Sequence, residues 1–223
     1  MFSGTRIMTT RRRVPAAAGA ALLAAVLAVG AAACGSSSPT APSQPVTLPT
    51  LAEMLAEKSI GSSTAPVTMV AYSSLACPFC ASFELQTLPQ IKSNYIDTGK
   101  VKYVFRDYPL GFEGEGAIAA AMVARCSGSA YFSAVDRLFQ NQAAWANAGD
   151  YKAAIKGVVS GIGLSSAFVD ACLVVPGLRD GILANRTMGD AQGVTGTPTF
   201  FINTQKVVGA QPYATFAAII DSM

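Results

Sequence analysis

Two cysteines separated by two residues, Cys77-Pro78-Phe79-Cys80, have the clearest chemical potential in this sequence. The residues before them predict a strand and those after them a helix, which places Cys77 at a helix N-terminus. Unpaired backbone N–H groups and the positive end of the helix dipole favour a thiolate at that position. A thiolate is the nucleophile of thiol–disulfide exchange, and Cys80, nearly one helical turn further on, could resolve the mixed disulfide.

Two other interpretations of the cysteine pair carry less weight. A structural zinc site needs four ligands, but the 223 residues include no histidine and no second pair of cysteines at this spacing. We therefore predict no metal site and no cofactor. A purely structural short-range disulfide is also disfavoured, because a position between strand and helix is what catalysis requires.

A second candidate feature is Thr197-Pro198, directly before an apolar run at 199–202. Proline is permitted at the start of a strand, and an X–Pro bond in a tight turn can be cis. Taken alone, an ordinary trans proline in a loop is the better interpretation. Because Pro198 lies downstream of the cysteine pair and of a long helical stretch, however, we favour the cis form.

The elements that must position these residues follow an α/β pattern. Apolar, β-branched runs predict strands at 66–72 and 101–107 and a hairpin with strands at 199–202 and 206–209. Periodicity and end signals predict helices at 51–58, 77–95 with a kink at Pro89, 178–192 and 213–223. The first strand, helix and strand favour a right-handed crossover and a parallel strand pair.

Between about residues 114 and 173 the sequence becomes helical. Apolar residues recur there at spacings of three and four, which predicts helices at 117–125, 131–142, 151–159 and 165–172. This stretch is expected to be a helical insertion in the α/β domain. Trp145 within it is expected to pack rather than to form a site.

Residues 1–33 have the pattern of an export signal. They contain four arginines, no acidic residue and then a long uncharged run of Ala, Leu and Val. Because such a run could span a bilayer as a helix of about 20 residues, an uncleaved anchor is the alternative. Small residues before Cys34 favour cleavage, and they resemble a bacterial lipoprotein signal in which this cysteine carries lipid. The Ser- and Pro-rich residues 34–48 predict a tether to a domain at 49–223.

Charge and cysteine content limit the compartment and the partners. The net charge of the chain is +3, but residues 34–223 hold twelve Lys and Arg against thirteen Asp and Glu, which does not suggest a nucleic-acid partner. With Cys34 lipidated, four cysteines remain, and an oxidising compartment allows two disulfides. For Cys126 and Cys172 we predict a structural disulfide worth a few kcal/mol, and two buried free thiols are the alternative.

Several segments together resemble the successive motifs of DsbA-like proteins of the thioredoxin family. They are Ala65-Pro66-Val67-Thr68, Cys77-Pro78-Phe79-Cys80, the run 95–101, Phe105-Arg106-Asp107-Tyr108-Pro109-Leu110, Ala124-Arg125-Cys126 and the run 196–202. The resemblance covers about residues 60–223 in order. It implies a thioredoxin-like fold with an inserted α-helical domain, a redox-active disulfide at Cys77 and Cys80, and a cis Pro198 packed against it. It also implies that substrate binds at Pro78, Phe79, Thr197 and Pro198, where an extended segment pairs with the backbone.

Three positions depart from the family pattern. Phe79 stands where the best-known oxidases have histidine, so one cation that would stabilise the Cys77 thiolate is missing. Ala71 occupies a position that is often a buried acid in this superfamily, and Ser74 one where many relatives have aspartate. These changes affect the expected redox potential and proton path, and they leave the nucleophile in place.

The resemblance implies a thiol–disulfide oxidoreductase, and residues 1–34 place it in the cell envelope, for example the periplasm, anchored on the extracytoplasmic side. Its partners would be exported proteins that contain cysteine, a redox partner that recycles the active site, and the lipid bilayer. Oxidation is favoured because no dimerisation domain of the isomerase kind is evident, whereas Thr197 favours reduction or isomerisation. A lipid-anchored binding protein of the same fold and a copper or zinc chaperone are the alternatives.

Overall fold

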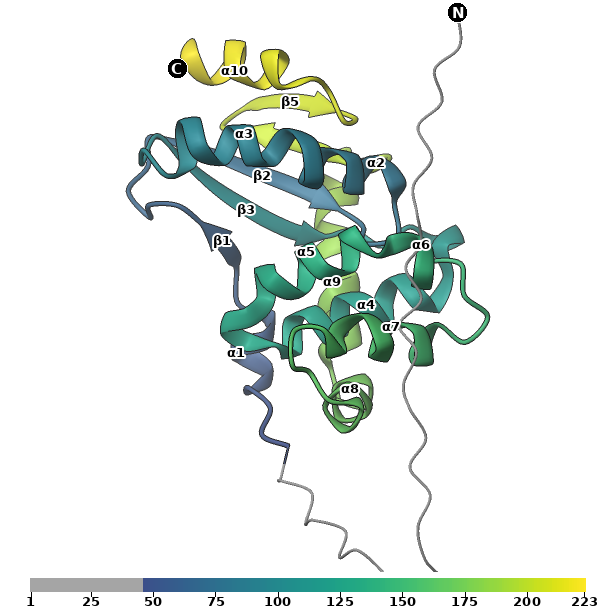
Figure 1. Cartoon of the computed structure of the whole chain (residues 1–223). Helices are drawn as coiled ribbons and strands as arrows, with labels where there is room; N and C mark the ends of the chain where they lie inside the picture. The colour runs from purple at the N-terminus through teal and green to yellow at the C-terminus, as the bar shows by residue number, and fades with distance from the viewer. Residues whose placement is uncertain (1–45) are drawn as a thin grey trace, which may run out of the picture. The chain divides into compact units, whose positions relative to one another are not determined.

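The structure is a computed structural model that describes residues 46–223, so the predicted export signal, Cys34 and most of the predicted tether lie outside the described residues. The strands form a five-stranded sheet in the order β1-β3-β2-β4-β5 (Figure 1). They are β1 (Lys58–Ile60), β2 (Val67–Ser73), β3 (Val101–Asp107), β4 (Thr199–Ile202) and β5 (Gln205–Val208). Strands β2 and β3 run parallel, as their order with the intervening helix predicts, and the other pairs are antiparallel.

One long helical segment connects β2 to β3. It consists of α2 (Pro78–Ser82), a π-helical turn (Phe83–Thr87), α3 (Leu88–Ile91) and a second π-helical turn (Lys92–Ile96). Pro89, where we predicted a kink, follows the first π-helical turn, in which the Leu88 N–H donates to the Phe83 carbonyl. The helix therefore departs from α-helical hydrogen bonding directly before Pro89, which has no N–H to donate.

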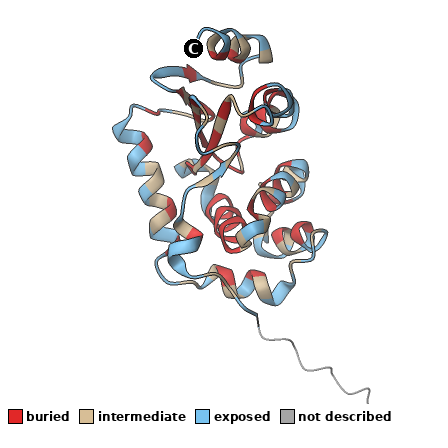
Figure 2. Cartoon of the chain, turned by 90° about the vertical axis from the view of Figure 1, so that its left-hand side faces the viewer, coloured by how far each residue is buried: buried red, intermediate tan, exposed pale blue. Residues whose placement is uncertain are grey.

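Aromatic packing attaches this helical segment and α10 (Tyr213–Asp221) to one face of the sheet. The Phe83 ring centroid lies 4.3 Å from that of Phe200 on β4 and 5.2 Å from that of Phe216 on α10. Figure 2 shows buried residues along the strands and along the inner sides of the helices. The helix that begins with the cysteine pair thus rests on the central strands of the sheet.

Helix α9 (Leu178–Ala191) covers the opposite face. Its Gly189 packs against the rings of Tyr72 and Tyr108, and a Cβ atom there would lie 2.7 Å from Tyr108. Only glycine lets the helix approach the sheet this closely. The Tyr108 hydroxyl shares its single proton between Asp190 and the Val194 carbonyl and so connects the end of this helix to the loop before β4.

The predicted helical insertion is present between β3 and α9. It contains α4 (Gly114–Cys126), α5 (Tyr131–Gln140), α6 (Gln142–Trp145), α7 (Tyr151–Ser160) and α8 (Ser166–Leu173), with short 3₁₀ turns at Gly111–Glu113 and Gly128–Ala130. Helix α4 is buried along most of its length, and the buried Trp145 donates its indole N–H to the Leu138 carbonyl. The predicted fold class, an α/β sheet with an inserted helical domain, is confirmed.

The prediction of a helix at 51–58 is wrong at its C-terminal end. Helix α1 (Leu51–Leu55) is capped by Thr50 and ends early, and Lys58–Ile60 forms β1. Ser59 pairs with Val104 of β3, so a contact distant in sequence overrides the local helical preference. Among residues 46–223, no helix combines the length and the apolar character needed to cross a membrane.

Candidate functional site

Cys77 lies at the N-terminus of α2, at the end of the loop that follows β2. Pro78 occupies the first turn of this helix, where a missing N–H costs nothing. The side chains of Cys77 and Cys80 are only 5% and 0% exposed, whereas that of Phe79 between them is 66% exposed. The structure therefore presents one apolar side chain to solvent beside two nearly covered sulfur atoms.

The surroundings of Cys77 favour its thiolate. A hydrogen bond from the Cys80 thiol is the largest cause that lowers the pKa of Cys77, to about 6, and burial opposes it. The Thr197 side chain and the backbone N–H groups of Cys80 and Phe79 lower this pKa further. Because the pKa lies below 7, Cys77 is mostly ionised at neutral pH and available as a nucleophile.

The surroundings of Cys80 have the opposite effect. Burial, followed by the hydrogen bond to Cys77, raises the pKa of Cys80 well above its ordinary value. The hydroxyls of Ser73 and Thr197 are buried and have no hydrogen-bond partner among the described residues. Ser73 lies where it can donate to a Cys80 thiolate and Thr197 where it can donate to a Cys77 thiolate. The pair thus consists of one ionised and one protonated sulfur.

The turn before β4 brings Thr197 to the cysteine pair. The Thr197–Pro198 peptide bond is cis, in agreement with the interpretation favoured from the sequence. In its thiol form Cys77 donates to the Thr197 carbonyl, with an Sγ–O distance of 3.4 Å. The Thr199 hydroxyl donates to the Gly196 carbonyl at 2.7 Å and so bridges the turn. A role for Thr197 and Pro198 in substrate binding remains a prediction.

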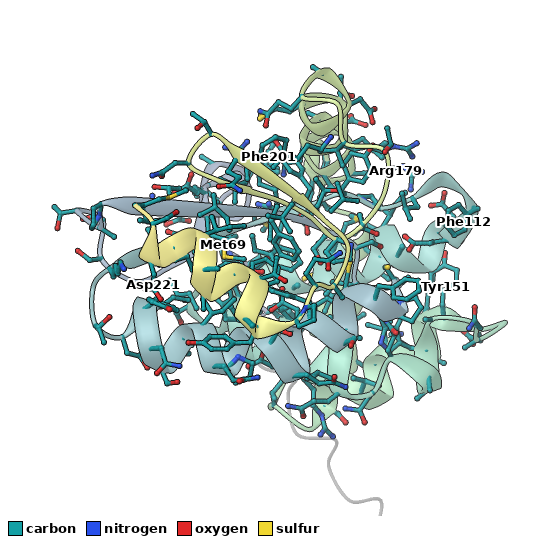
Figure 3. The ribbon with its side chains drawn as sticks, turned by 90° about the horizontal axis from the view of Figure 1, so that it is seen from above. Met69, Phe112, Tyr151, Arg179, Phe201 and Asp221 are labelled. Carbon is teal, nitrogen blue, oxygen red and sulfur yellow. The ribbon has the colours of Figure 1, made fainter. Side chains whose placement is uncertain are left out.

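A cavity of about 570 Å³ opens beside Cys77. Its wall includes Cys77, Phe79, Phe112, Glu113 and Thr197. The Phe112 side chain is 87% exposed and lies at the periphery of the molecule (Figure 3). The cavity thus combines the nucleophilic sulfur of Cys77 with two exposed aromatic side chains, Phe79 and Phe112. Such a cavity suits a polypeptide segment that has an apolar residue near its reacting cysteine.

The helical insertion contributes Gln142, which we did not predict from the sequence. The Gln142 side-chain amide on α6 donates to the Leu75 carbonyl at 2.7 Å and to the Cys77 carbonyl at 3.0 Å. These two bonds fix the loop before α2 from the side of the insertion. A glutamine in a helical segment carries no signal of such a contact, so only the structure could reveal it.

Glu84 is a second residue that the sequence analysis missed. Burial raises its pKa to about 8, and the Tyr103 hydroxyl donates to its Oε1 at 2.6 Å. Glu84 is four residues after Cys80 on the same helical segment, and residues at this spacing share a helix face. This spacing is the signal that could have pointed to an acid on the Cys80 face of the helix, in the absence of an acid at position 71.

Glu84→Gln is expected to change the pH dependence of stability. The Glu84 carboxyl stays protonated in the folded protein up to about pH 8 but ionises near its ordinary 4.5 in the unfolded chain. The unfolded state then binds fewer protons, so wild-type stability falls by about 1.4 kcal/mol per pH unit between about pH 5 and 8 because of this one group. Urea unfolding at several pH values should show the smaller slope of the variant. Parallel curves would contradict the prediction, and Glu57→Gln on the surface is the matched control.

Cys126 and Cys172 meet in the insertion, at the ends of α4 and α8. Both are fully buried, and both are free thiols in the structure, as are Cys77 and Cys80. A hydrogen bond that the Cys172 thiol donates to Cys126, together with burial, raises the pKa of Cys172. The two side chains are thus in contact, and the disulfide between them remains a prediction. Among the described residues, no three metal-binding side chains are grouped to hold an ion.

Comparisons with known proteins agree with this geometry. A family model described as thioredoxin matches residues 54–222. A curated Rickettsia typhi protein, named as a candidate protein-disulfide oxidoreductase, is 29% identical over 147 residues, which are 65% of this chain and 53% of that protein. The chain thus spans about half the length of the curated Rickettsia relatives it matches. Disulfide bond formation protein D of Bacillus subtilis is 36% identical over 63 residues, 28% of each chain.

Two solved structures resemble this one along most of its length. The α-DsbA1 structure of Wolbachia pipientis has a TM-score of 0.68 and 28% identity, and the match covers 75% of this chain and 90% of that one. Oxidised BdbD of Bacillus subtilis has a TM-score of 0.67 and 19% identity, and the match covers 78% of this chain and 95% of that one. At this low identity, the match supports the fold alone. The thioredoxin-like fold implied by the sequence motifs is confirmed.

Proposed function

Since the chain belongs to the thioredoxin family, we propose that it is a thiol–disulfide oxidoreductase that forms disulfides in exported proteins through Cys77 and Cys80. The observation that carries the proposal is the opposite ionisation of the two sulfurs. The pKa of Cys77 lies near 6 and that of Cys80 is raised well above its ordinary value. Exchange needs this difference, because one sulfur must attack or leave as thiolate while the other holds its proton.

The ionisation of Cys77 also supports the oxidising direction. A low pKa at Cys77 stabilises the reduced form of the protein, because the thiolate gains hydrogen bonds that the disulfide cannot accept as strongly. A dithiol protein with a stabilised reduced form is a stronger oxidant of its partners. With Phe79 at this position, no histidine neighbours the Cys77 thiolate. Hydrogen bonds from Cys80 and Thr197 stabilise the thiolate instead.

The test is the stoichiometric oxidation of a reduced peptide that contains two cysteines. The disulfide form of the wild-type protein is expected to convert one equivalent of peptide dithiol to disulfide, as measured by mass spectrometry. Cys77→Ala should leave the peptide reduced. Oxidation by both proteins at equal rates, or by neither, would contradict the proposal.

The proposed site of action is the extracytoplasmic side of a cell membrane, with Cys34 lipidated as anchor. The signal-like residues 1–33 and the small residues before Cys34 support it. Cells fed a labelled fatty acid should incorporate the label into the full-length chain and not into Cys34→Ala. Equal labelling of both would contradict lipidation at this residue.

A further inference from the structure

Glu113 is held beside the cysteine pair by bonds to one of its two oxygens. It ends the 3₁₀ turn before α4 and lines the cavity together with Cys77. Its Oε2 accepts hydrogen bonds from the Ser74 hydroxyl at 2.5 Å and from the Leu110 N–H at 2.9 Å. Ser74 also accepts from the Ala76 N–H at 3.3 Å, so the carboxyl group is connected to the loop that carries Cys77.

The other oxygen of Glu113 is available to a ligand. Oε1 has no hydrogen-bond partner among residues 46–223, and it is not one of the polar atoms sealed inside the protein. The charged groups that act on this carboxyl are Cys77, directly before α2, and Arg186 on α9. Burial is the largest influence on the pKa of Glu113 and raises it, whereas the hydrogen bonds from Ser74 and Leu110 and the charge of Arg186 lower it. The charge of a Cys77 thiolate also raises this pKa, but only in the reduced protein. A carboxylate with a raised pKa is a stronger base.

The oxidation of a substrate dithiol needs a base at this place. An ordinary cysteine has a pKa of about 8.5, so a substrate thiol arrives mostly protonated at pH 7. Only its thiolate attacks a disulfide. Cys77 cannot accept the proton, because its sulfur is the disulfide atom under attack. Resting on the proposed function, we propose that Glu113 is the general base that takes the proton from the incoming substrate thiol in the cavity.

The step balances in atoms and electrons. The substrate S–H proton moves to Glu113 Oε1, a bond forms between the substrate sulfur and Cys77 Sγ, and the Cys77–Cys80 bond breaks. Cys80 leaves with the electron pair and takes up a proton from solvent, since burial favours its thiol form, and Glu113 gives its proton back to solvent. The second substrate thiol then gives its proton to the Glu113 carboxylate, attacks the first substrate sulfur and releases Cys77 as a thiolate. Of the two protons that the substrate loses, one is balanced by the proton on Cys80 and the other is released to solvent. The substrate loses two electrons, and the protein disulfide gains them.

The test compares Glu113→Gln with wild type in single-turnover oxidation of a reduced two-cysteine peptide between pH 5.5 and 9.5. Both proteins begin in the disulfide form. At pH 7 the variant is expected to be about 10- to 100-fold slower, within the range of general-base effects. The difference should disappear above pH 9, because the peptide then arrives as thiolate. Glu115→Gln, which removes the same charge from an exposed residue outside this cavity, should follow the wild-type profile.

Two further measurements separate proton transfer from a structural role. An aromatic thiol that is already ionised at pH 7 should reduce the disulfide form of both proteins at equal rates. The pKa of Cys77, followed by alkylation of the reduced proteins, should not rise in the variant. A variant that equals wild type at every pH, or that is slower by one constant factor at every pH and with both thiols, overturns the proposal. A wild-type protein that does not oxidise the peptide overturns the proposed function as well.

Discussion

Cys80→Ala is expected to turn the protein into a covalent trap for its substrates. Cys77 still lines the cavity as a nucleophile, but Cys80 is no longer there to release the mixed disulfide that it forms. The variant also loses the hydrogen bond that is the largest cause of the low pKa of Cys77, so trapping should be faster at pH 8 than at pH 6. Turnover should fall by roughly three orders of magnitude or more, as when a covalent catalyst loses an essential group.

The measurement is electrophoresis of the variant after it has been mixed with a peptide disulfide. A band of higher mass, the mixed disulfide between the protein and the peptide, should appear without reductant and disappear when dithiothreitol is added. The double variant Cys77→Ala/Cys80→Ala is the control and should form no such species. An adduct of equal yield in the double variant would show that another cysteine reacts, and a fully active Cys80→Ala would exclude it as the resolving residue.

Arg125→Met is expected to destabilise the fold by about 3–5 kcal/mol, the range found when one partner of a buried ion pair is removed. Arg125 on α4 and Asp107 at the end of β3 are ion-paired, and each side chain is only 2% exposed. Arg125 also donates to the Met54 carbonyl at 2.8 Å and so attaches α1 to the core. Without the guanidinium, the buried Asp107 loses its ion-pair partner, and of the cations nearby Lys58 acts on it only through charge, without an ion pair.

Urea unfolding followed by circular dichroism at pH 7 measures this loss. The double variant Asp107→Leu/Arg125→Met should recover most of the stability, because a well-packed apolar pair can replace a buried ion pair at little cost. A loss below 1 kcal/mol in Arg125→Met would contradict the prediction. A double variant as unstable as the single one would show that the bonds to α1, rather than the unpaired Asp107, determine the loss.

The sequence predicted the elements that local patterns control. The strand at 66–72, the helix after Cys77 and the hairpin before the last helix all lie within a residue or two of the observed bounds, because alternation and end signals act over short distances. β1 was missed, since three residues at a sheet edge have no pattern of their own and depend on pairing with β3. Glu84 could have been inferred from its four-residue spacing to Cys80, but its burial could not.

The sequence by itself determined the nucleophile and its helix N-terminus, because both follow from residue types within a few positions of Cys77. Only the tertiary structure decided how acidic that sulfur is and what surrounds it. Thr197 reaches Cys77 across 120 positions of sequence, Gln142 across 65, and Glu113 is tied to Ser74 across 39. The pKa of a thiol depends on burial and on donors within a few ångströms, and these distances are set by the packing of the insertion and β4 around α2.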